Sequence, residues 1–168
     1  MAPSEERSHS AQRSILSTLA VVLKLPPVLF FLCLFASWYA GLHFPLALPL
    51  SFAAQISAGV VILVFAAAFG LLAGREMVKA KTPIEPGSAP VALVTTGPFR
   101  VSRNPLYLTL TTTLFAIGVM LASLWIVLAS LLLVLLLNFL VIPGEEARLA
   151  AEFPEEFDAY RKRVRRWL

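Results

Sequence analysis

Residues 103–146 read RNPLYLTLTTTLFAIGVMLASLWIVLASLLLVLLLNFLVIPGEE, a run whose charged side chains stand only at its two ends. The 41 residues from 104 to 144 contain no Asp, Glu, Lys or Arg. A helix rises about 1.5 Å per residue and needs about 20 apolar residues to cross a bilayer, so this run holds two spans. We expect them near 106–121 and 124–142, joined by a tight turn into an antiparallel hairpin.

A second charge-free stretch of 50 residues covers positions 25–74. The same argument from length places two more spans there, near 27–41 and 52–73. The sequence therefore predicts an all-α integral membrane protein of about four transmembrane helices. A polar loop between the two pairs and amphipathic helices over 145–168 complete the expected fold.

Composition supports one membrane-embedded domain rather than a soluble one. The 168 residues are 58% hydrophobic and 14% charged, with a mean hydropathy of +0.81, whereas soluble domains are about 25% charged. We expect residues 14–168 to form this domain and the polar residues 1–13 to be a disordered tail. Cys33 is the single cysteine, and with only His9 and His43 beside it we expect no metal site.

The distribution of basic residues predicts the topology. The turns inside the two pairs of spans carry no charge, whereas the loop between the pairs contains Arg75, Lys79, Lys81, Arg100 and Arg103. By the positive-inside rule this loop is cytoplasmic, and an even number of spans puts both termini on the same side. The net charge is +4. Because the basic residues adjoin spans, anionic lipid headgroups are a simpler partner for them than nucleic acid.

The last 24 residues, 145–168, change character and carry six acidic and six basic side chains. Apolar residues still recur at spacings of three and four, so one helical face stays apolar. Because proline is tolerated only in a helix's first turn, Pro154 predicts a break near Phe153 and a new helix to about Arg166. We expect Phe153, Phe157 and Tyr160 to pack over the cytoplasmic mouth of the hairpin, and the basic end and Trp167 to lie at headgroup level.

The polar corner before the third span is the first candidate site. Asn104 is a good N-cap residue and Pro105 a good first helical residue, which leaves free backbone N–H groups and a positive helix end. Arg100 and Arg103 stand beside that end, so the corner suits a carboxylate or phosphate. An ordinary helix cap with two arginines on lipid headgroups explains the same residues equally well.

The second candidate is the pair Glu145 and Glu146, directly after the fourth span. Acids at a helix start also stabilise the helix dipole, which is the plainer explanation. The hairpin should nevertheless bring these acids next to the Arg103 corner, at one depth in the membrane. Cations beside acids suit a zwitterionic ligand, but any phosphate or amino acid group could use the same corner.

Two separated motifs carry a family resemblance. The first is Leu93-Val94-Thr95-Thr96-Gly97-Pro98-Phe99-Arg100 followed by Ser102-Arg103-Asn104-Pro105-Leu106-Tyr107-Leu108. The second is Glu145-Glu146-Ala147-Arg148-Leu149, with Phe153, Glu155-Glu156-Phe157, Tyr160 and Arg163-Val164 after it. With the hairpin between them, residues 83–168 resemble the isoprenylcysteine carboxyl methyltransferases and the related phospholipid methyltransferases, especially their short bacterial members. A bacterial inner (plasma) membrane is therefore the expected location.

The resemblance implies a site for S-adenosylmethionine and a lipid-borne or small hydrophobic acceptor that arrives from the membrane. Arg103 and the glutamates would lie nearest the methyl transfer. The cofactor pocket implied by the family would be formed by Thr96, Gly97, Pro98, Arg100, Arg103, Asn104, Pro105, Tyr107, Glu145 and Glu146. The acceptor group, whether a carboxylate, an amine or a thiol, is not decided by these motifs.

Three departures from the family pattern concern the acceptor and the site. Asn104 replaces the histidine of the eukaryotic carboxyl methyltransferases, Gly144 stands where a basic residue often precedes the acids, and Pro154 stands where glycine is usual. Because an amide does not titrate, Asn104 has no proton-transfer role. Two other functions fit parts of the pattern: an NADPH-dependent sterol-reductase-like enzyme, which has a similar Arg-x-Pro-x-Tyr corner, and a helical membrane subunit without enzymatic activity.

Overall fold

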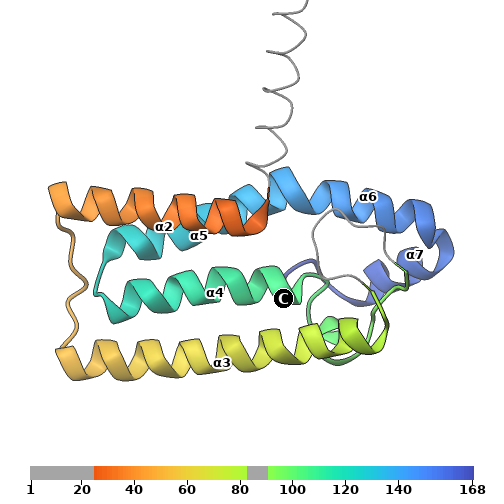
Figure 1. Ribbon diagram of the computed structural model, residues 1–168, viewed down its shortest axis with the longest axis horizontal. Helices are drawn as coiled ribbons and strands as arrows, with labels where there is room; N and C mark the ends of the chain where they lie inside the picture. Colours follow the sequence, from red (N-terminus) through yellow and green to blue (C-terminus); the bar gives the residue numbers. More distant parts are fainter. Residues whose placement is uncertain (1–24, 83–90) are drawn as a thin grey trace, which may run out of the picture.

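The computed structural model describes residues 25–82 and 91–168, so the expected polar tail at 1–13 lies outside the described residues. Long helices run side by side along the length of the molecule (Figure 1). They are α2 (Pro26–His43), α3 (Phe52–Lys79), α4 (Pro105–Met120) and α5 (Leu124–Leu136). The last of these continues without a break through a π-helical turn, η2 (Leu137–Val141), into α6 (Ile142–Glu152).

Three helices are long and apolar enough to cross a membrane: α2 with 18 residues, α3 with 28, and the 29-residue helix that starts at Leu124. Helix α4 is apolar but shorter, at 16 residues. It lies between two of these spans for its whole length (Figure 1). The predicted all-α membrane fold of about four spans is therefore confirmed.

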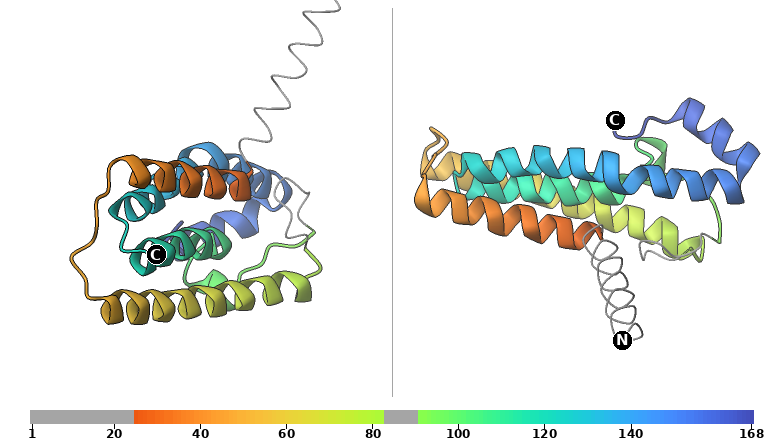
Figure 2. Two further views of the ribbon diagram at one scale, coloured as in Figure 1. Left: turned by 60° about the vertical axis from the view of Figure 1, so that its left-hand side comes forward. Right: turned by 90° about the horizontal axis from the view of Figure 1, so that it is seen from above.

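The helices pack in the order α3, α4, α5, α2, so that the hairpin of α4 and α5 separates the two helices of the first pair (Figures 1 and 2). Small residues allow the close contacts. A Cβ atom at Gly118 would lie 2.8 Å from the backbone nitrogen of Val127, and one at Gly59 would lie 3.1 Å from the carbonyl oxygen of Ala116. Glycine at these positions thus lets neighbouring backbones approach, as in other lipid-embedded helix pairs.

The connections at one end of the bundle, which we call the turn end, are joined to each other. The backbone N–H of Leu48 donates to the carbonyl of Ala122 at 2.8 Å, and that of Leu124 donates to Leu46 at 2.9 Å. The indole of Trp125 donates to the carbonyl of Phe44 at 2.6 Å. Loop 44–51 therefore lies against the hairpin turn, where backbone groups of Phe44, Leu46 and Leu48 find partners.

The packed core lies between α2 and the hairpin. It consists of the buried apolar side chains Leu29, Phe30, Cys33, Leu114, Ile126, Ala129, Leu133, Leu137 and Ile142. Cys33 therefore behaves as a small packed hydrophobe. Most other apolar side chains of α3 and α5 point outward, as expected for surfaces that face lipid.

The opposite end of the bundle, which we call the polar end, differs from the prediction in two helix boundaries. Helix α3 continues past the expected residue 73 to Lys79, where Lys79 pairs with Glu76 at 2.6 Å. The chain breaks at Phe153 as predicted, but α7 (Pro154–Arg163) ends three residues before Arg166. Val164 has an extended backbone and residues 165–168 are not helical, so the carbonyls of residues 164–166 accept hydrogen bonds from the Arg103 corner instead of continuing the helix. We call residues 164–168 the C-terminal strap.

Candidate functional site

The corner before α4 is built differently from a standard helix cap. Helix α4 begins at Pro105 as predicted, but the side chain of Asn104 does not cap it. Instead, Nδ2 of Asn104 donates to the carbonyl of Arg166 at 3.0 Å, and Oγ of Ser102 accepts from the backbone N–H of Asn104 at 3.1 Å. Asn104 therefore occupies the predicted N-cap position, but its side chain makes no capping hydrogen bond and binds the strap instead.

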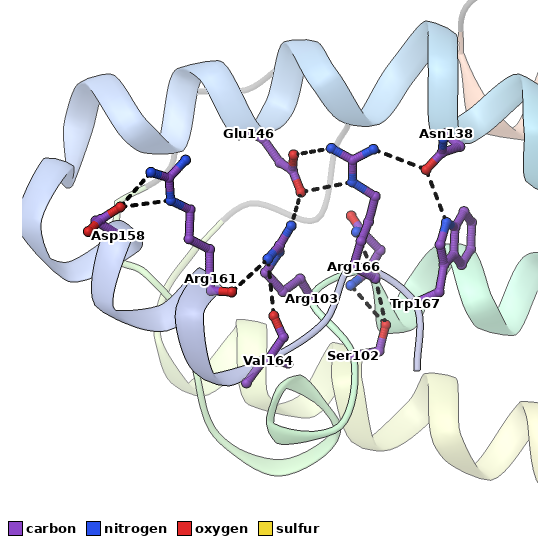
Figure 3. Close-up of polar contacts among 10 residues, drawn as sticks. Ser102, Arg103, Asn138, Glu146, Asp158, Arg161, Val164, Arg166 and Trp167 are labelled. Atoms are coloured by element: carbon purple, nitrogen blue, oxygen red, sulfur yellow. Dashed lines mark hydrogen bonds and ion pairs between the residues drawn. The ribbon is translucent and has the colours of Figure 1, made fainter.

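Arg103 lies at the centre of the polar end (Figure 3). One terminal nitrogen donates to Oε1 of Glu146 at 2.7 Å, and the other donates to the carbonyls of Arg161 and Val164 at 3.2 and 3.0 Å. The carbonyls at the end of α7 have no partner within the helix, so a guanidinium is well placed there. The two motifs thus meet in an ion pair whose side chains are only 14% and 19% exposed.

Glu146 has a second arginine partner that the sequence analysis missed. Arg166 of the strap bonds both of its carboxylate oxygens, with Nε to Oε1 at 3.1 Å and a terminal nitrogen to Oε2 at 2.5 Å. Burial alone would raise the pKa of Glu146, but hydrogen bonds from Arg166 and Arg103 outweigh it and lower the pKa. Glu146 is therefore a fixed anion and a poor proton acceptor.

Glu145 has a different environment, although it is the adjacent residue. The hydroxyl of Tyr107 donates to its Oε1 at 2.5 Å. Burial raises the pKa of Glu145 and outweighs the opposing effects of the Tyr107 hydrogen bond and the charge of Arg148. Neighbouring acids whose pKa values move in opposite directions are a common feature of acid–base sites.

The two acids do not lie at a free helix end, as the helix-dipole explanation requires. Helices α5 and α6 are continuous through η2, and Glu145 is the fourth residue of α6. The N–H groups of that turn therefore already have partners in the preceding turn. Their position at the boundary of the apolar segment is better explained by the contacts with Tyr107 and the arginines.

The loop before the corner is held by α3. The hydroxyl of Thr96 donates to Oε2 of Glu76 at 2.5 Å. Gly97 begins a short 3-10 helix, η1 (Gly97–Arg100), with a φ of +58°, and a Cβ there would lie 2.9 Å from Cγ of Glu76. Pro98 is buried in this turn. Glycine is needed at position 97 for both its backbone conformation and its close contact.

Helix α7 covers the same loop, turning back beside α6 (Figure 2). Tyr160 is 3% exposed, and its hydroxyl donates to the carbonyl of Phe99 at 2.7 Å. Burial raises the pKa of Tyr160 to about 12. Phe157 is also buried, whereas Phe153, at the break, is half-buried. Of the three side chains expected to pack over the hairpin mouth, Phe157 and Tyr160 are the buried ones.

Trp167 and Asn138 join the strap to the hairpin. Oδ1 of Asn138 accepts from the indole of Trp167 at 3.2 Å and from Arg166 at 3.1 Å (Figure 3). Trp167 thus packs against the core rather than facing the headgroups freely. Asn138 could have been recognised from the sequence, because it is the only carboxamide in the predicted span 124–142, and amides inside spans commonly bond across helices.

The structure brings together Arg103, Asn104, Tyr107, Glu145 and Glu146 at the polar end. Thr96, Gly97 and Pro98 lie against α3, and Arg100 is exposed. Among residues 25–82 and 91–168, no hydrogen bond or ion pair joins the loop 96–100 directly to Glu145 or Glu146. The candidate site is therefore centred on the corner and the acids, with the loop beside it.

Comparison with known proteins identifies the family. A family model described as phospholipid methyltransferase matches residues 54–156, from α3 to the first turn of α7. The match includes the first motif and the second as far as Glu156, and it ends before Phe157, Tyr160 and the strap. No curated protein and no solved structure matches the chain. Because the model covers well over half of the sequence, the chain belongs to the phospholipid methyltransferase family.

Proposed function

We propose that the protein transfers a methyl group from S-adenosylmethionine to a lipid-borne or small hydrophobic acceptor at the cytoplasmic face of the membrane. The observation that carries this proposal is the meeting of Arg103, Tyr107 and the Glu145–Glu146 pair at the polar end of the hairpin. A methyltransferase family and an apolar helical fold support it. The basic loop between the pairs of spans supports the cytoplasmic orientation.

The residues at the polar end fit the chemistry of this cofactor. Its carboxylate needs cationic donors, and its ammonium, sulfonium and ribose hydroxyls need acceptors. Nε of Arg103 is buried and has no hydrogen-bond partner within the described part of the chain, so the corner retains an unused donor. Glu145 supplies a carboxylate with a single hydrogen-bond donor, Tyr107, among the described residues. In this proposal Arg103 holds the carboxylate, and the glutamates hold the cationic and hydroxyl groups.

The remaining family-motif residues would shape the pocket around these charges. Asn104 and Pro105 set the start of α4 and thereby the direction in which Tyr107 points. The turn from Thr96 to Arg100, held by α3, would form the wall beside the corner. These assignments follow the family motif residue by residue and rest on it together with the positions described above.

When bound, S-adenosylmethionine would supply a methyl group that its sulfonium already activates, so that the acceptor could displace S-adenosylhomocysteine as the leaving group. The chain's own residues then have two tasks, to orient the reactants in line and to exclude water. A carboxylate acceptor needs no base, whereas a protonated amine must first lose a proton. Glu145 is the residue suited to take that proton, because its pKa is raised while Glu146 is committed to two arginines.

A direct test uses the purified full chain in nanodiscs made from native lipid extract. Incubation with methyl-labelled S-adenosylmethionine should label a lipid or hydrophobic product, which mass spectrometry then identifies. In parallel, calorimetric titration should show that Arg103→Ala and Glu146→Ala each bind the cofactor about tenfold to a hundredfold more weakly, as expected for a lost charge-assisted hydrogen bond. Lys79→Ala is the control, since Lys79 is exposed and pairs only with Glu76 among the described residues.

Two results would contradict the proposal. One is saturable binding of NADPH with none of S-adenosylmethionine, which points to reductase chemistry. The other is affinity for S-adenosylmethionine that is equal in all variants, which reduces the corner and the acids to structural contacts.

A further inference from the structure

The C-terminal strap, residues 164–168, lies beyond the part of the chain that the family model matches. Its backbone nevertheless meets the corner residues one after another. The carbonyl of Val164 accepts from the guanidinium of Arg103, the carbonyl of Arg165 accepts from the Arg103 backbone N–H at 3.0 Å, and that of Arg166 accepts from Ser102 and Asn104. The position of Arg103 therefore depends on where the strap lies.

Two side chains fix the strap itself. Arg166 forms a fork on Glu146 with two nitrogens, and its third nitrogen donates to Oδ1 of Asn138 at 3.1 Å. Its side chain is 32% exposed, so it lies at the surface of the cluster rather than in the core. All three guanidinium nitrogens of Arg166 are bonded to residues on two helical turns, so the side chain is held in one orientation. The single flexible amine of a lysine cannot make the same set of contacts.

Asn138 lies in the π-helical turn η2, which directly precedes α6, the helix that carries Glu145 and Glu146. A π turn changes the direction of the residues that follow it and is often found at functional sites. Here the single oxygen Oδ1 of Asn138 accepts from both Arg166 and Trp167. This oxygen thus determines the positions of two consecutive strap residues.

We propose that Arg166 and Asn138 are positioning residues: together they dock the C-terminal strap, and the docked strap holds Arg103 in its working orientation. Arg166 acts through Glu146 and the strap carbonyls and does not touch the reacting atoms. The role in methyl transfer rests on the proposed function, whereas the docking itself does not. The docking is therefore testable without any cofactor.

Trp167 reports the docking directly. In a Trp38→Phe, Trp125→Phe background, Trp167 is the single indole, and acrylamide quenching of its fluorescence in nanodiscs measures its protection. Arg166→Gln and Asn138→Leu should make Trp167 as accessible to the quencher as a solvent-exposed indole. Asn138→Asp keeps the accepting oxygen and should preserve protection. Arg163→Gln is the matched control, since Arg163 is exposed and bonds only within its own helix in the described structure.

A second measurement connects the strap to Arg103. Melting temperatures of Arg103→Gln, Arg166→Gln and the double variant form a cycle, and the two changes should not be additive because they act on one network. In the full chain, Arg166→Gln should bind S-adenosylmethionine about tenfold more weakly, and Arg166→Lys should recover only part of this loss.

The outcomes separate the two proposals. If Trp167 stays protected in both Arg166→Gln and Asn138→Leu, or if the cycle is additive, the positioning role is overturned. The positioning role is also overturned if Trp167 becomes accessible to the quencher in these variants while their affinity for S-adenosylmethionine stays unchanged. If the unaltered chain does not bind S-adenosylmethionine, the proposed function fails, while quenching and the cycle still decide whether Arg166 and Asn138 position Arg103.

Discussion

The hydroxyl of Tyr107 and the carboxylate of Glu145, 38 positions apart in the chain, share a hydrogen bond of 2.5 Å that joins α4 to α6. If Glu145 accepts a proton from the acceptor, this bond tunes the reaction. Tyr107 stabilises the charged carboxylate, so Tyr107→Phe should raise the pKa of Glu145 further. Because the base works when deprotonated, the acidic limb of the pH–kcat profile should move to higher pH. A lost bond to a charged group, about 1.5 to 3 kcal/mol, corresponds to about one to two pH units.

The companion variant Glu145→Gln separates catalysis from binding. It should lower kcat about a hundredfold or more for an amine acceptor, the usual contribution of a general base, even when saturating S-adenosylmethionine compensates for weaker cofactor binding. Rates measured over pH 5 to 9 with saturating S-adenosylmethionine give both the shift of the acidic limb in Tyr107→Phe and the loss of kcat in Glu145→Gln. A pH profile that is identical in wild type and Tyr107→Phe would remove Glu145 from the proton-transfer step.

Gly97→Ala should damage the loop that α3 supports. The φ of +58° is unfavourable for any residue with a Cβ atom, and that atom would lie 2.9 Å from Glu76. We expect a loss of about 1 to 2 kcal/mol in stability. Thermal unfolding in detergent measures it, and Gly144→Ala is the control because a Cβ there would meet nothing within 4 Å. An equal shift for both variants would show that the Gly97 conformation is not the cause.

Tyr160→Phe should lower stability at neutral pH by about 1 kcal/mol, the usual value of one hydrogen bond, because the carbonyl of Phe99 loses its donor. The difference should depend on pH. The folded pKa of Tyr160 is raised to about 12 from an ordinary value of 10, so its stabilising effect is complete below pH 10 and is lost as the pH rises toward 12. Unfolding midpoints of the two proteins should converge over that range, and a constant difference would contradict the buried phenol.

The orientation in the membrane is also open to a direct test. In a Cys33→Ala background, single cysteines at Val91 and Ala47 should react with an impermeant maleimide from opposite sides, since both positions are exposed. Ala47 pairs with Ser123 at the turn end, whereas Ala92, next to Val91, bonds to Thr82 just after α3 at the polar end. Val91 should be labelled only after the cells are opened. Labelling of both from the same side would refute the orientation derived from the basic loop.

The spans could be predicted because charge gaps depend on the bilayer rather than on details of packing. The expected third span at 106–121 and the observed α4 at 105–120 differ by one residue at each end. The extension of α3 to Lys79 was missed, because Gly74 to Lys79 are not needed to cross the lipid. Their helix is stabilised instead by the contact of Glu76 with Lys79 and Thr96.

Only the part of the site that follows from the α4–α5 hairpin could be predicted from the sequence. A helix that returns to the same face brings the corner near the acids, so Arg103 and Glu146 could be placed together. The second partner, Arg166, depends on a non-helical strap that follows α7 and lies against the corner, and no local pattern predicts that path. Asn104 shows the same limit, since its strong preference for capping is overridden by a strap carbonyl.

The order of the helices in space has a consequence for how the protein assembles during synthesis. The hairpin of α4 and α5 lies between α2 and α3, which precede it in the chain. The first two helices therefore enter the bilayer without the partners they will pack against, and lipid must solvate both until the hairpin arrives. Closure of the bundle then waits until the hairpin has been synthesised, and the polar end first becomes complete when the strap has followed it.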